Sequence, residues 1–577
     1  MTAILGLRSK HDAAAALVID GELVAAVAEE RFTRRKHYFG FPKQSIEFVL
    51  AQAGLRPHQV EIIARDGLSL GKVLARLGRQ MFYAWAPRLY SEVLGAALDR
   101  YIWRKKDIKG SEEWLLHEMG FAPSWHYVEH HLGHAAYSYY ASGQDNALVI
   151  ALDGRGHYLG GAIYAARETS LTKVSEIIAE GGSLGLFYSA VTDTLGFQVG
   201  DGDGKTMGLA CYGDPWGALA DLEQFAPKVV GLELRKPREW QLDTAVIRNR
   251  LYAHYQEAAA LRLLTDKHGE ANIAAAAQLI LERRIDELVR NAVATTGLRH
   301  LVGGGGVFLN VKASKWLIDQ GLVDSVFVAP GPGDEGLAAG YAMVAYAERF
   351  ARPKPLASPY LGPGYSDEEV QFALKTYSDV AYEPLTNVAE TTADLIISGQ
   401  VVGWFQGRME WGPRALGARS VLADPRDPNM RDRINSLLKK RDWFMPFAPS
   451  VLAEYCDECF VNYRSSPYMN LAFSMRPPYD TLVPAIMHVD STARPQAVYR
   501  ETNPVYYDMI EAFRRRTGIP MILNTSFNRH GLPIVCTPPD AIEHLQWGAI
   551  DILVIGPFLA RRTGEPKPPP DKRSVHG

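Results

Sequence analysis

The chain has 577 residues, with 62 basic against 65 acidic side chains and a net charge of -3. At roughly 150 residues per domain, this length predicts two to four domains. Hydrophobic residues make up 47% and charged residues 22%, which is typical of a soluble globular protein. The near-neutral balance argues against a general nucleic-acid binder. Four scattered cysteines, with Cys456 and Cys459 in a lone CxxC, favour buried thiols in a reducing compartment over a disulfide framework.

Hydropathy along the chain argues against a membrane or secreted protein. No apolar run approaches the ~18 residues that a helix needs to span a bilayer. The first residues, MTAILGL, lack the basic region and cleavage site of a signal peptide. We therefore expect a cytoplasmic protein that has neither a membrane nor a nucleic acid as its partner.

Two segments of the first half share one plan. Residues 3–7 (AILGL) predict a buried strand, residues 13–19 a second strand, and Asp20 with Gly21 a hairpin turn into ELVAAVAEE. Residues 147–166 repeat this plan as the strand ALVIAL, the polar loop DGRGHYLG and the returning strand GAIYAA. We predict an α/β fold with this unit duplicated, as in actin-like ATPases, although hairpins are common and the repeat alone leaves that fold open.

Amino-acid composition predicts helical segments, a linker and a disordered tail in other parts of the chain. Residues 66–120 are rich in aromatic residues and helix formers, and predict a helical insertion for core or dimer packing or for the wall of an acceptor pocket. Residues 271–296 have apolar side chains at helical spacing and predict a structural helix. Prolines and glycines predict the following division: a first domain at 1–351, a linker at 352–364, a second domain at 365–562 and a disordered tail at 563–577.

Two histidines and two aspartates predict a metal site. His130 and His134 lie four residues apart in VEHHLGHAAYSYY, a spacing that puts both imidazoles on one face of a helix. Asp153 and Asp334 each follow an apolar strand, where carboxylates project into a cleft. Such a set suits iron(II), zinc or manganese. A histidine pair alone is often only a helix surface, and the HExxH motif would need glutamate in place of His131.

Two glycine-rich segments and a basic cluster predict phosphate binding. HLVGGGGVFLN (300–310) and GDGDGKTMGLACYG (200–213) suit a nucleotide, with Lys205 able to reach a phosphate, although glycine loops also serve as plain turns. Between residues 401 and 450, arginines alternate with glycine, proline and aromatic residues, which favours bidentate phosphate or carboxylate binding over a solvated charged face. The strand end ILNTSFN (522–528) offers further polar substrate contacts.

Together these segments resemble the carbamoyltransferase family of the NodU, cephamycin and tobramycin O-carbamoyltransferase type. The resemblance runs through nearly the whole chain, and the order and number of its motifs make it specific. The motifs are HDAAAALVIDG (11–21), AEERFTRRKH (28–37), HHLGHAA (130–136), DGRG (153–156), GKTMGLACYG (204–213), GGGGVFLN (303–310), GPRALGARS (412–420), PFAPS (446–450) and LNTSFN (523–528).

The resemblance implies an actin-like first domain followed by a YrdC-like α/β domain. The second domain would condense carbamoyl phosphate with ATP, releasing pyrophosphate and forming carbamoyl-adenylate. The first domain would then transfer the carbamoyl group to a hydroxyl of a small-molecule acceptor. The cofactors implied are ATP with Mg²⁺ and a bound metal, Fe(II) in the family picture. A homodimer is left open.

The resemblance also assigns roles to residues. The metal ligands fall on His130, His134, Asp153 and Asp334, and the catalytic groups on His11, Arg414 and Lys439. The nucleotide- and phosphate-binding residues would be Lys205, Gly304, Gly305, Gly306, Asn310, Arg408, Arg419, Arg441, Asn524 and Ser526.

Met445 departs from the family, which commonly has arginine directly before PFAPS, so that Arg441 or Lys440 would have to substitute. Three rival classes remain: a hydrogenase-type maturation factor that carbamoylates a protein cysteine, a tRNA threonylcarbamoyl enzyme, and an actin-like scaffold without activity. The first would carry CxxC zinc fingers ahead of these domains, the second a basic surface, and the third would leave the arginine cluster without a purpose.

Overall fold

The computed structural model describes residues 1–68, 110–236, 255–439 and 442–569. The chain forms two compact units, the first made of Met1–Ala25 with Gly40–Leu356 and the second of Ala26–Phe39 with Ala357–Gly577. The change of unit after Leu356 falls inside the predicted linker. Residues 26–39, which the sequence-based division placed in a continuous first domain, cluster with the second unit instead. Most of the predicted insertion at 66–120 and the end of the predicted tail lie outside the described residues.

The first unit begins with a five-stranded sheet of order β3-β2-β1-β4-β5. Strand β1 pairs antiparallel with β2 and parallel with β4, which in turn pairs parallel with β5. Its interior strands β2, β1 and β4 are buried almost throughout, and charged residues occur in them only toward the ends of β1 and β4. The strands are β1 (Ala3–Arg8), β2 (Ala14–Ile19), β3 (Glu22–Ala28), β4 (Ile62–Asp66) and β5 (Ser124–Val128).

A second five-stranded sheet of the same unit has the order β12-β11-β6-β7-β8. Its central strand β6 again pairs antiparallel with the next strand and parallel with a later one, β11, which pairs parallel with β12. The two sheets therefore share one topology, which confirms the duplication predicted from the sequence. The strands are β6 (Asn146–Gly156), β7 (Leu159–Arg167), β8 (Ser170–Ile178), β11 (His300–Gly304) and β12 (Ser325–Val328).

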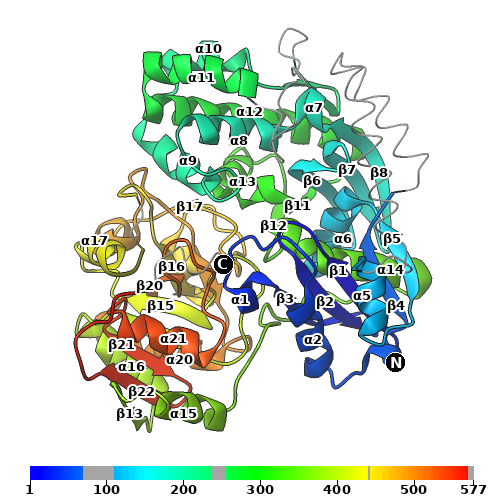
Figure 1. Ribbon diagram of the computed structural model, residues 1–577. Helices are drawn as coiled ribbons and strands as arrows, with labels where there is room; N and C mark the ends of the chain where they lie inside the picture. Colours follow the sequence, from blue (N-terminus) through cyan, green and yellow to red (C-terminus); the bar gives the residue numbers. More distant parts are fainter. Residues whose placement is uncertain (69–109, 237–254, 440–441, 570–577) are drawn as a thin grey trace. The chain divides into compact units, whose positions relative to one another are not determined.

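Helices follow or cover these strands, and in Figure 1 α6 and α14 lie beside the strands of the two sheets. The helix predicted at 271–296 is α12, which ends at Gly297 in the left-handed conformation that glycine adopts without strain. The longer helices of the first unit are α2 (Lys43–Gln52), α5 (Glu112–Glu118), α6 (His130–Ser142), α8 (Leu184–Thr194), α9 (Asp203–Leu209), α10 (Trp216–Glu223), α11 (Tyr255–His268), α12 (Glu270–Thr296), α13 (Val311–Asp319) and α14 (Leu337–Arg349).

Glycine allows helices α6 and α14 to cross almost backbone to backbone. A Cβ atom on Gly340 of α14 would overlap the carbonyl of Gly133 in α6, and one on Gly133 would overlap Tyr341 and Leu337. Gly6 in β1 is packed in the same way against the backbone of Ala338. The first turn of α14 is therefore held close to both α6 and the first sheet.

The second unit is built on an eight-stranded mixed sheet of order β13-β22-β21-β14-β15-β20-β16-β19. Its strands are β13 (Val380–Pro384), β14 (Val402–Phe405), β15 (Arg419–Ala423), β16 (Ala448–Leu452), β19 (Gln496–Val498), β20 (Met521–Ser526), β21 (Ile552–Ile555) and β22 (Phe558–Arg562). Its helices include α15 (Asp367–Lys375), α16 (Val388–Ile397), α17 (Met430–Ile434), α20 (Pro504–Thr517) and α21 (Pro538–Gln546).

The segment 26–39, which contains the short helix α1 (Glu30–Thr33), is anchored within the second unit. Phe32 packs against an apolar cluster of Met409, Ile534 and Cys536. Arg34 donates to the carbonyl of Ile534, and Arg31 donates to that of Gly412. The motif AEERFTRRKH is thus part of the second unit, although it lies near the start of the chain.

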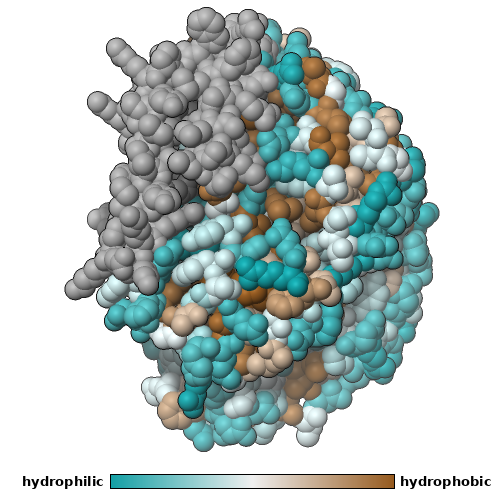
Figure 2. Space-filling model, turned by 90° about the vertical axis from the view of Figure 1, so that its right-hand side faces the viewer, coloured by the Kyte–Doolittle hydropathy of each residue, from teal (hydrophilic) through white to brown (hydrophobic). Residues whose placement is uncertain are grey.

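Among the described residues, no helix combines the length and the apolar character required to cross a bilayer. On the face in Figure 2, hydrophobic residues are interrupted by hydrophilic ones.

Replacing Gly340 by alanine tests the crossing of α6 and α14. Because the new methyl group would overlap the Gly133 carbonyl, we expect Gly340→Ala to lower the free energy of unfolding by about 2 kcal/mol. The matched control is Gly217→Ala in α10, where a Cβ atom meets nothing within 4 Å, so that the better helix former is tolerated. Urea denaturation measures both variants, and equal stabilities would contradict the close crossing.

Candidate active site

The side chains predicted as metal ligands lie where strands of both sheets end. His130 begins α6 directly after β5, Asp153 lies in the last residues of β6, and Asp334 lies between β12 and α14. The loop after β11 joins this edge, because the Gly305 N–H donates to Pro332 O at 2.8 Å. The carboxyl ends of parallel strands are the usual place for a binding site in an α/β sheet.

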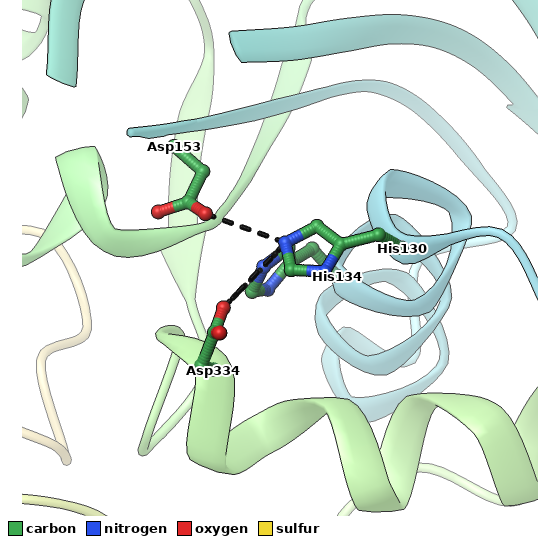
Figure 3. A group of neighbouring side chains, drawn as sticks. All are labelled: His130, His134, Asp153 and Asp334. Atoms are coloured by element: carbon green, nitrogen blue, oxygen red, sulfur yellow. Dashed lines mark hydrogen bonds and ion pairs between the residues drawn. The ribbon is translucent and has the colours of Figure 1, made fainter. Parts of the chain in front are cut away.

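The four predicted ligands converge. The Nε2 atoms of His130 and His134 are 3.1 Å apart, and Asp153 Oδ2 lies 3.3 Å from the His130 Nε2. Asp334 Oδ1 lies 3.5 Å from each of the two Nε2 atoms. One ligand atom of each residue lies within 4.8 Å of the others, and Figure 3 shows the four side chains pointing toward one another.

Local packing explains why the sequence brings these four groups together. A Cβ atom on Gly156 would overlap the His130 imidazole, so the second glycine of DGRG leaves room for that ring. Tyr137, one turn beyond His134 on α6, donates to Pro330 O at 2.5 Å and holds the loop that carries Asp334. The motifs HHLGHAA and DGRG therefore form one packed cluster.

Electrostatics keep the carboxylates charged and His130 neutral. Burial lowers the pKa of His130 and so favours the neutral imidazole. Burial alone would raise the pKa of Asp334, but the charge of Arg8 and the neighbouring His130 hold it well below its usual range. Burial would also raise the pKa of Asp153, but its hydrogen bond with His130 and the neighbouring His134 together lower it. Neutral imidazoles and ionised carboxylates are the forms that bind a divalent cation.

Sequence reasoning missed a layer of charged residues around this site. Arg8, at the end of β1, forms an ion pair with Asp334, and its Nη1 lies 3.9 Å from Asp66 Oδ2. Asp66, at the end of β4, also pairs with Lys10 and accepts a contact of 3.4 Å from His157 Nε2. The signal that points to Arg8 and Asp66 is the same as for Asp153 and Asp334, a charged residue at the end of an apolar strand.

His157 has a defined protonation pattern. The backbone N–H of His130 donates to His157 Nδ1 at 3.2 Å, so the ring proton of the neutral imidazole sits on Nε2, facing Asp66. Burial lowers the pKa of His157 to about 4, even though Asp66 favours the charged form. His157 thus links the first residue of α6 to the end of β4.

Two other acid–base groups lie close by. His11, the predicted catalytic histidine, is partly exposed in the loop after β1, and its Nδ1 lies 2.6 Å from Asp12 Oδ2. Arg8 Nε donates to the His11 carbonyl at 3.3 Å, which ties this loop to the pair with Asp334. Glu335, one residue beyond Asp334, is half-buried, and desolvation together with Asp12 raises its pKa to about 7.

The glycine segment 303–306 serves close packing. A Cβ atom on Gly304 would press on the His134 carbonyl, and one on Gly305 would overlap the Leu152 carbonyl. The Gly306 N–H donates to Asp153 Oδ1 at 3.3 Å. Asn310 accepts from Ala313 N as the cap of α13, and exchanges hydrogen bonds with the amide of Gln278. Their nucleotide role stays a prediction.

The segment 200–213 is mostly helical, which differs from the predicted loop. Asp203 accepts from Gly200 N at 3.0 Å and from Ser189 Oγ at 3.2 Å, which secures the start of α9. Lys205 lies on this helix, with its Nζ 5.4 Å from the centroid of the Phe197 ring. The predicted phosphate contact of Lys205 is not tested by this arrangement.

In the second unit, the side chain of Arg419 holds several backbone segments together through hydrogen bonds. It is fully buried at the start of β15 and stacks on Phe405, with 3.6 Å from its guanidinium carbon to the ring centroid. Its Nη1 donates to Gln406 O and Ala418 O, and its Nη2 donates to Pro363 O and Gly407 O. This fork positions the strand ends around it, a role that the sequence-based phosphate assignment did not foresee.

Other predicted residues of the second unit are placed as follows. Arg408 is half-buried and donates to Gly362 O and Leu361 O, while Arg414 is half-buried in the loop before β15. Asn524 is buried and donates to Ala415 O, Ser450 Oγ and Gln496 Oε1. Ser526 donates to Asn528 Oδ1 at 2.6 Å. The Lys439 side chain and Arg441 lie outside the described part of the chain, whereas Cys456 and Cys459 are buried free thiols.

Comparison with known proteins identifies the family. The model of the carbamoyltransferase N-terminus matches residues 3–343, and that of the carbamoyltransferase C-terminus matches residues 393–562. The chain therefore belongs to the carbamoyltransferase family of enzymes, as its motifs indicated.

Its relatives include nodulation proteins. The nodulation protein NolNO of Sinorhizobium fredii is 34% identical over 96% of this chain and 80% of that protein, and the nodulation protein U of Rhizobium tropici is 28% identical over 95% and 94%. The uncharacterized protein sll1178 of Synechocystis sp. is 35% identical over 99% of both chains. Among solved structures, full-length HypF in a phosphate- and nucleotide-bound form matches 61% of this chain and 56% of that one, with 14% identity and a TM-score of only 0.34.

Substituting His157 tests its buried neutral state. In the unfolded chain this histidine takes up a proton when the pH falls below about 6.5. In the folded chain it does so only near pH 4. The contribution of His157 to the free energy of unfolding is therefore fully present above about pH 6.5. It is lost as the pH falls toward 4, and the loss reaches about 3 kcal/mol. We expect His157→Asn, which keeps an acceptor for the His130 N–H, to make the free energy of unfolding less dependent on pH in this window. The exposed His58→Asn is the control, and an unchanged slope in His157→Asn would contradict the assignment.

Proposed function

We propose that this enzyme is an ATP-dependent O-carbamoyltransferase. It would use carbamoyl phosphate, ATP and water to form carbamoyl-adenylate with release of phosphate and pyrophosphate, and would then transfer the carbamoyl group to a hydroxyl of a small molecule. The observation that carries the proposal is the convergence of two imidazole nitrogens and two carboxylate oxygens within 4.8 Å, in a chain of the carbamoyltransferase family.

The residues of the first unit fit a divalent metal ion. Asp334 Oδ1 is buried without a hydrogen-bond partner among the described residues, although it faces two imidazoles. A buried acceptor of this kind is costly unless a cation or donor satisfies it. Two nitrogen and two oxygen donors suit Fe(II), zinc or manganese, and of these we propose Fe(II), which the family resemblance implies. When bound, such an ion would act as a Lewis acid toward a carbamoyl or phosphate oxygen.

Proton transfer would fall to His11. Its Nδ1 is paired with Asp12, so that Nε2 is the basic nitrogen of the neutral ring. An acceptor hydroxyl would give its proton to this nitrogen as its oxygen attacks the carbamoyl carbon. The partial exposure of His11 allows an acceptor to reach it.

The adenylate would form in the second unit, which we propose to be YrdC-like. Arg419 fixes the strand ends and Arg414 remains in the adjoining loop as a group that can neutralise reacting phosphates, with Lys439 as its proposed partner. Nucleotide binding in the first unit would involve Lys205 and the loop at 303–306. The proposed partner is a hydroxylated natural product or sugar, and neither a nucleic acid nor a membrane.

A substitution in each unit should separate the two half-reactions. We expect His130→Ala to abolish carbamoyl transfer but to keep ATP–pyrophosphate exchange with carbamoyl phosphate, because only the metal ligands are damaged. His58→Ala, at an exposed histidine of the same unit, is the control. Normal transfer by His130→Ala would contradict the metal assignment.

We expect Arg414→Ala to lose the exchange reaction itself, since it removes a positive charge proposed to act on the phosphates. Pyrophosphate release from ATP and carbamoyl phosphate is the readout, and its absence in the unaltered protein would favour a scaffold without activity. Candidate aminoglycosides, β-lactam precursors, macrolides and nodulation oligosaccharides can then be screened by mass spectrometry for the gain of one carbamoyl group.

A further inference from the structure

Each aspartate of the candidate metal site divides its two oxygens between the protein and the site. Asp334 directs Oδ2 to the guanidinium of Arg8, whereas Oδ1 faces the imidazoles of His130 and His134. Asp153 accepts the Gly306 N–H with Oδ1 and directs Oδ2 to His130. One oxygen of each carboxylate is therefore already committed to the chain.

Arg8 is held firmly in this position. It is buried, with 5% of its surface exposed, and its Nε donates to the His11 carbonyl at 3.3 Å. On its other side stands Asp66, which is itself fixed by Lys10 and His157. Burial opposes the charged guanidinium, but Asp334 and Asp66 outweigh it and raise the pKa of Arg8, so it remains a cation.

A cation at this place is unexpected if the site only needs to attract a metal ion. Like charges a few ångströms apart repel each other, so Arg8 lowers the affinity of the site for any divalent ion. Asp334 without Arg8 would have two free oxygens, and carboxylates bind metal ions through either one or both. The presence of Arg8 therefore points to control of how Asp334 binds.

We propose that Arg8 is a positioning residue that restricts Asp334 to one oxygen ligand and so keeps a coordination position of the metal ion open for a substrate oxygen. Arg8 contacts the ligand Asp334 and not the reacting atoms. The proposal rests on the proposed function, because it requires that His130, His134, Asp153 and Asp334 bind a metal ion.

Titration with Co²⁺ alone tests this role, because the visible absorption of Co²⁺ changes with its coordination number. In the full-length Arg8→Met protein, both Asp334 oxygens can turn to the ion and the repelling charge is gone. We expect Co²⁺ to bind about tenfold more tightly or better, its absorption to change, and carbamoyl transfer to fall. A tighter site with lower activity is a combination that simple misfolding does not produce. Arg8→Lys, which keeps a charged donor for Oδ2, should restore the absorption of the unaltered protein.

The matched control is Arg290→Met, which removes an ion pair with Asp286 on the exposed side of α12 and should leave the Co²⁺ spectrum unchanged. A spectrum of Arg8→Met identical to that of the unaltered protein, or weaker Co²⁺ binding, would overturn the proposal. If Arg8→Met does not fold, Asp66→Asn is measured in its place, because Asp66 anchors Arg8. We expect this variant to shift the Co²⁺ spectrum in the same direction as Arg8→Met. An unchanged spectrum would overturn the role of Arg8. If the unaltered protein binds no Co²⁺, the proposed metal site itself fails.

Discussion

The close crossing of α6 and α14 is the constraint on which the first unit depends. Gly133 and Gly340 bring the two backbones together, and Asp334 lies just before the first turn of α14. His130 and His134 lie on α6 on either side of Gly133 in the sequence. A side chain at the crossing would separate the helices and, with them, the carboxylate from the imidazoles. A packing requirement and a chemical one are thus met by the same few residues.

The two sheets contribute different chemistry to this place. Asp153 and Asp334, the carboxylates that face the imidazoles, come from the carboxyl ends of strands in the second sheet. Arg8 and Asp66, which hold one of these carboxylates in position, come from the ends of β1 and β4 in the first sheet. Buried ion pairs of this kind contribute little net stability, because desolvation offsets the attraction. Their value lies in fixing the direction of a charged oxygen, which a single hydrogen bond from the backbone does for Asp153.

Much of this site could be predicted from the sequence because it is encoded locally. A spacing of four residues on a helix placed His130 and His134 on one face, and an apolar strand followed by a carboxylate indicated Asp153 and Asp334. The role of Arg8 could not be predicted in this way, since its partner is more than 300 positions away. The glycines at 303–306 have a packing role that their sequence pattern did not reveal. Their freedom suggested a phosphate loop, while close approach to His134 and Leu152 accounts for two of them.

The second unit shows the same ambiguity for arginine. From the sequence, Arg419 and Arg414 are equal members of one basic cluster. In the structure, the guanidinium of Arg419 donates hydrogen bonds to four backbone carbonyls. The loop between them is further held by the buried Glu410, which accepts the N–H groups of Leu416, Ala418 and Arg419.

At the other end of the loop that carries Arg414, the carbonyl of Gly412 accepts a hydrogen bond from Arg31 of the segment 26–39. The loop that carries Arg414 is therefore held at both ends, by Arg31 at Gly412 and by Glu410 and Arg419 where the loop enters β15. Within this motif Arg419 supports the backbone, and phosphate contacts of Arg414 and Arg419 stay predictions. The same reasoning explains why residues 26–39 belong with the second unit: they complete the support of a loop encoded almost 400 positions later.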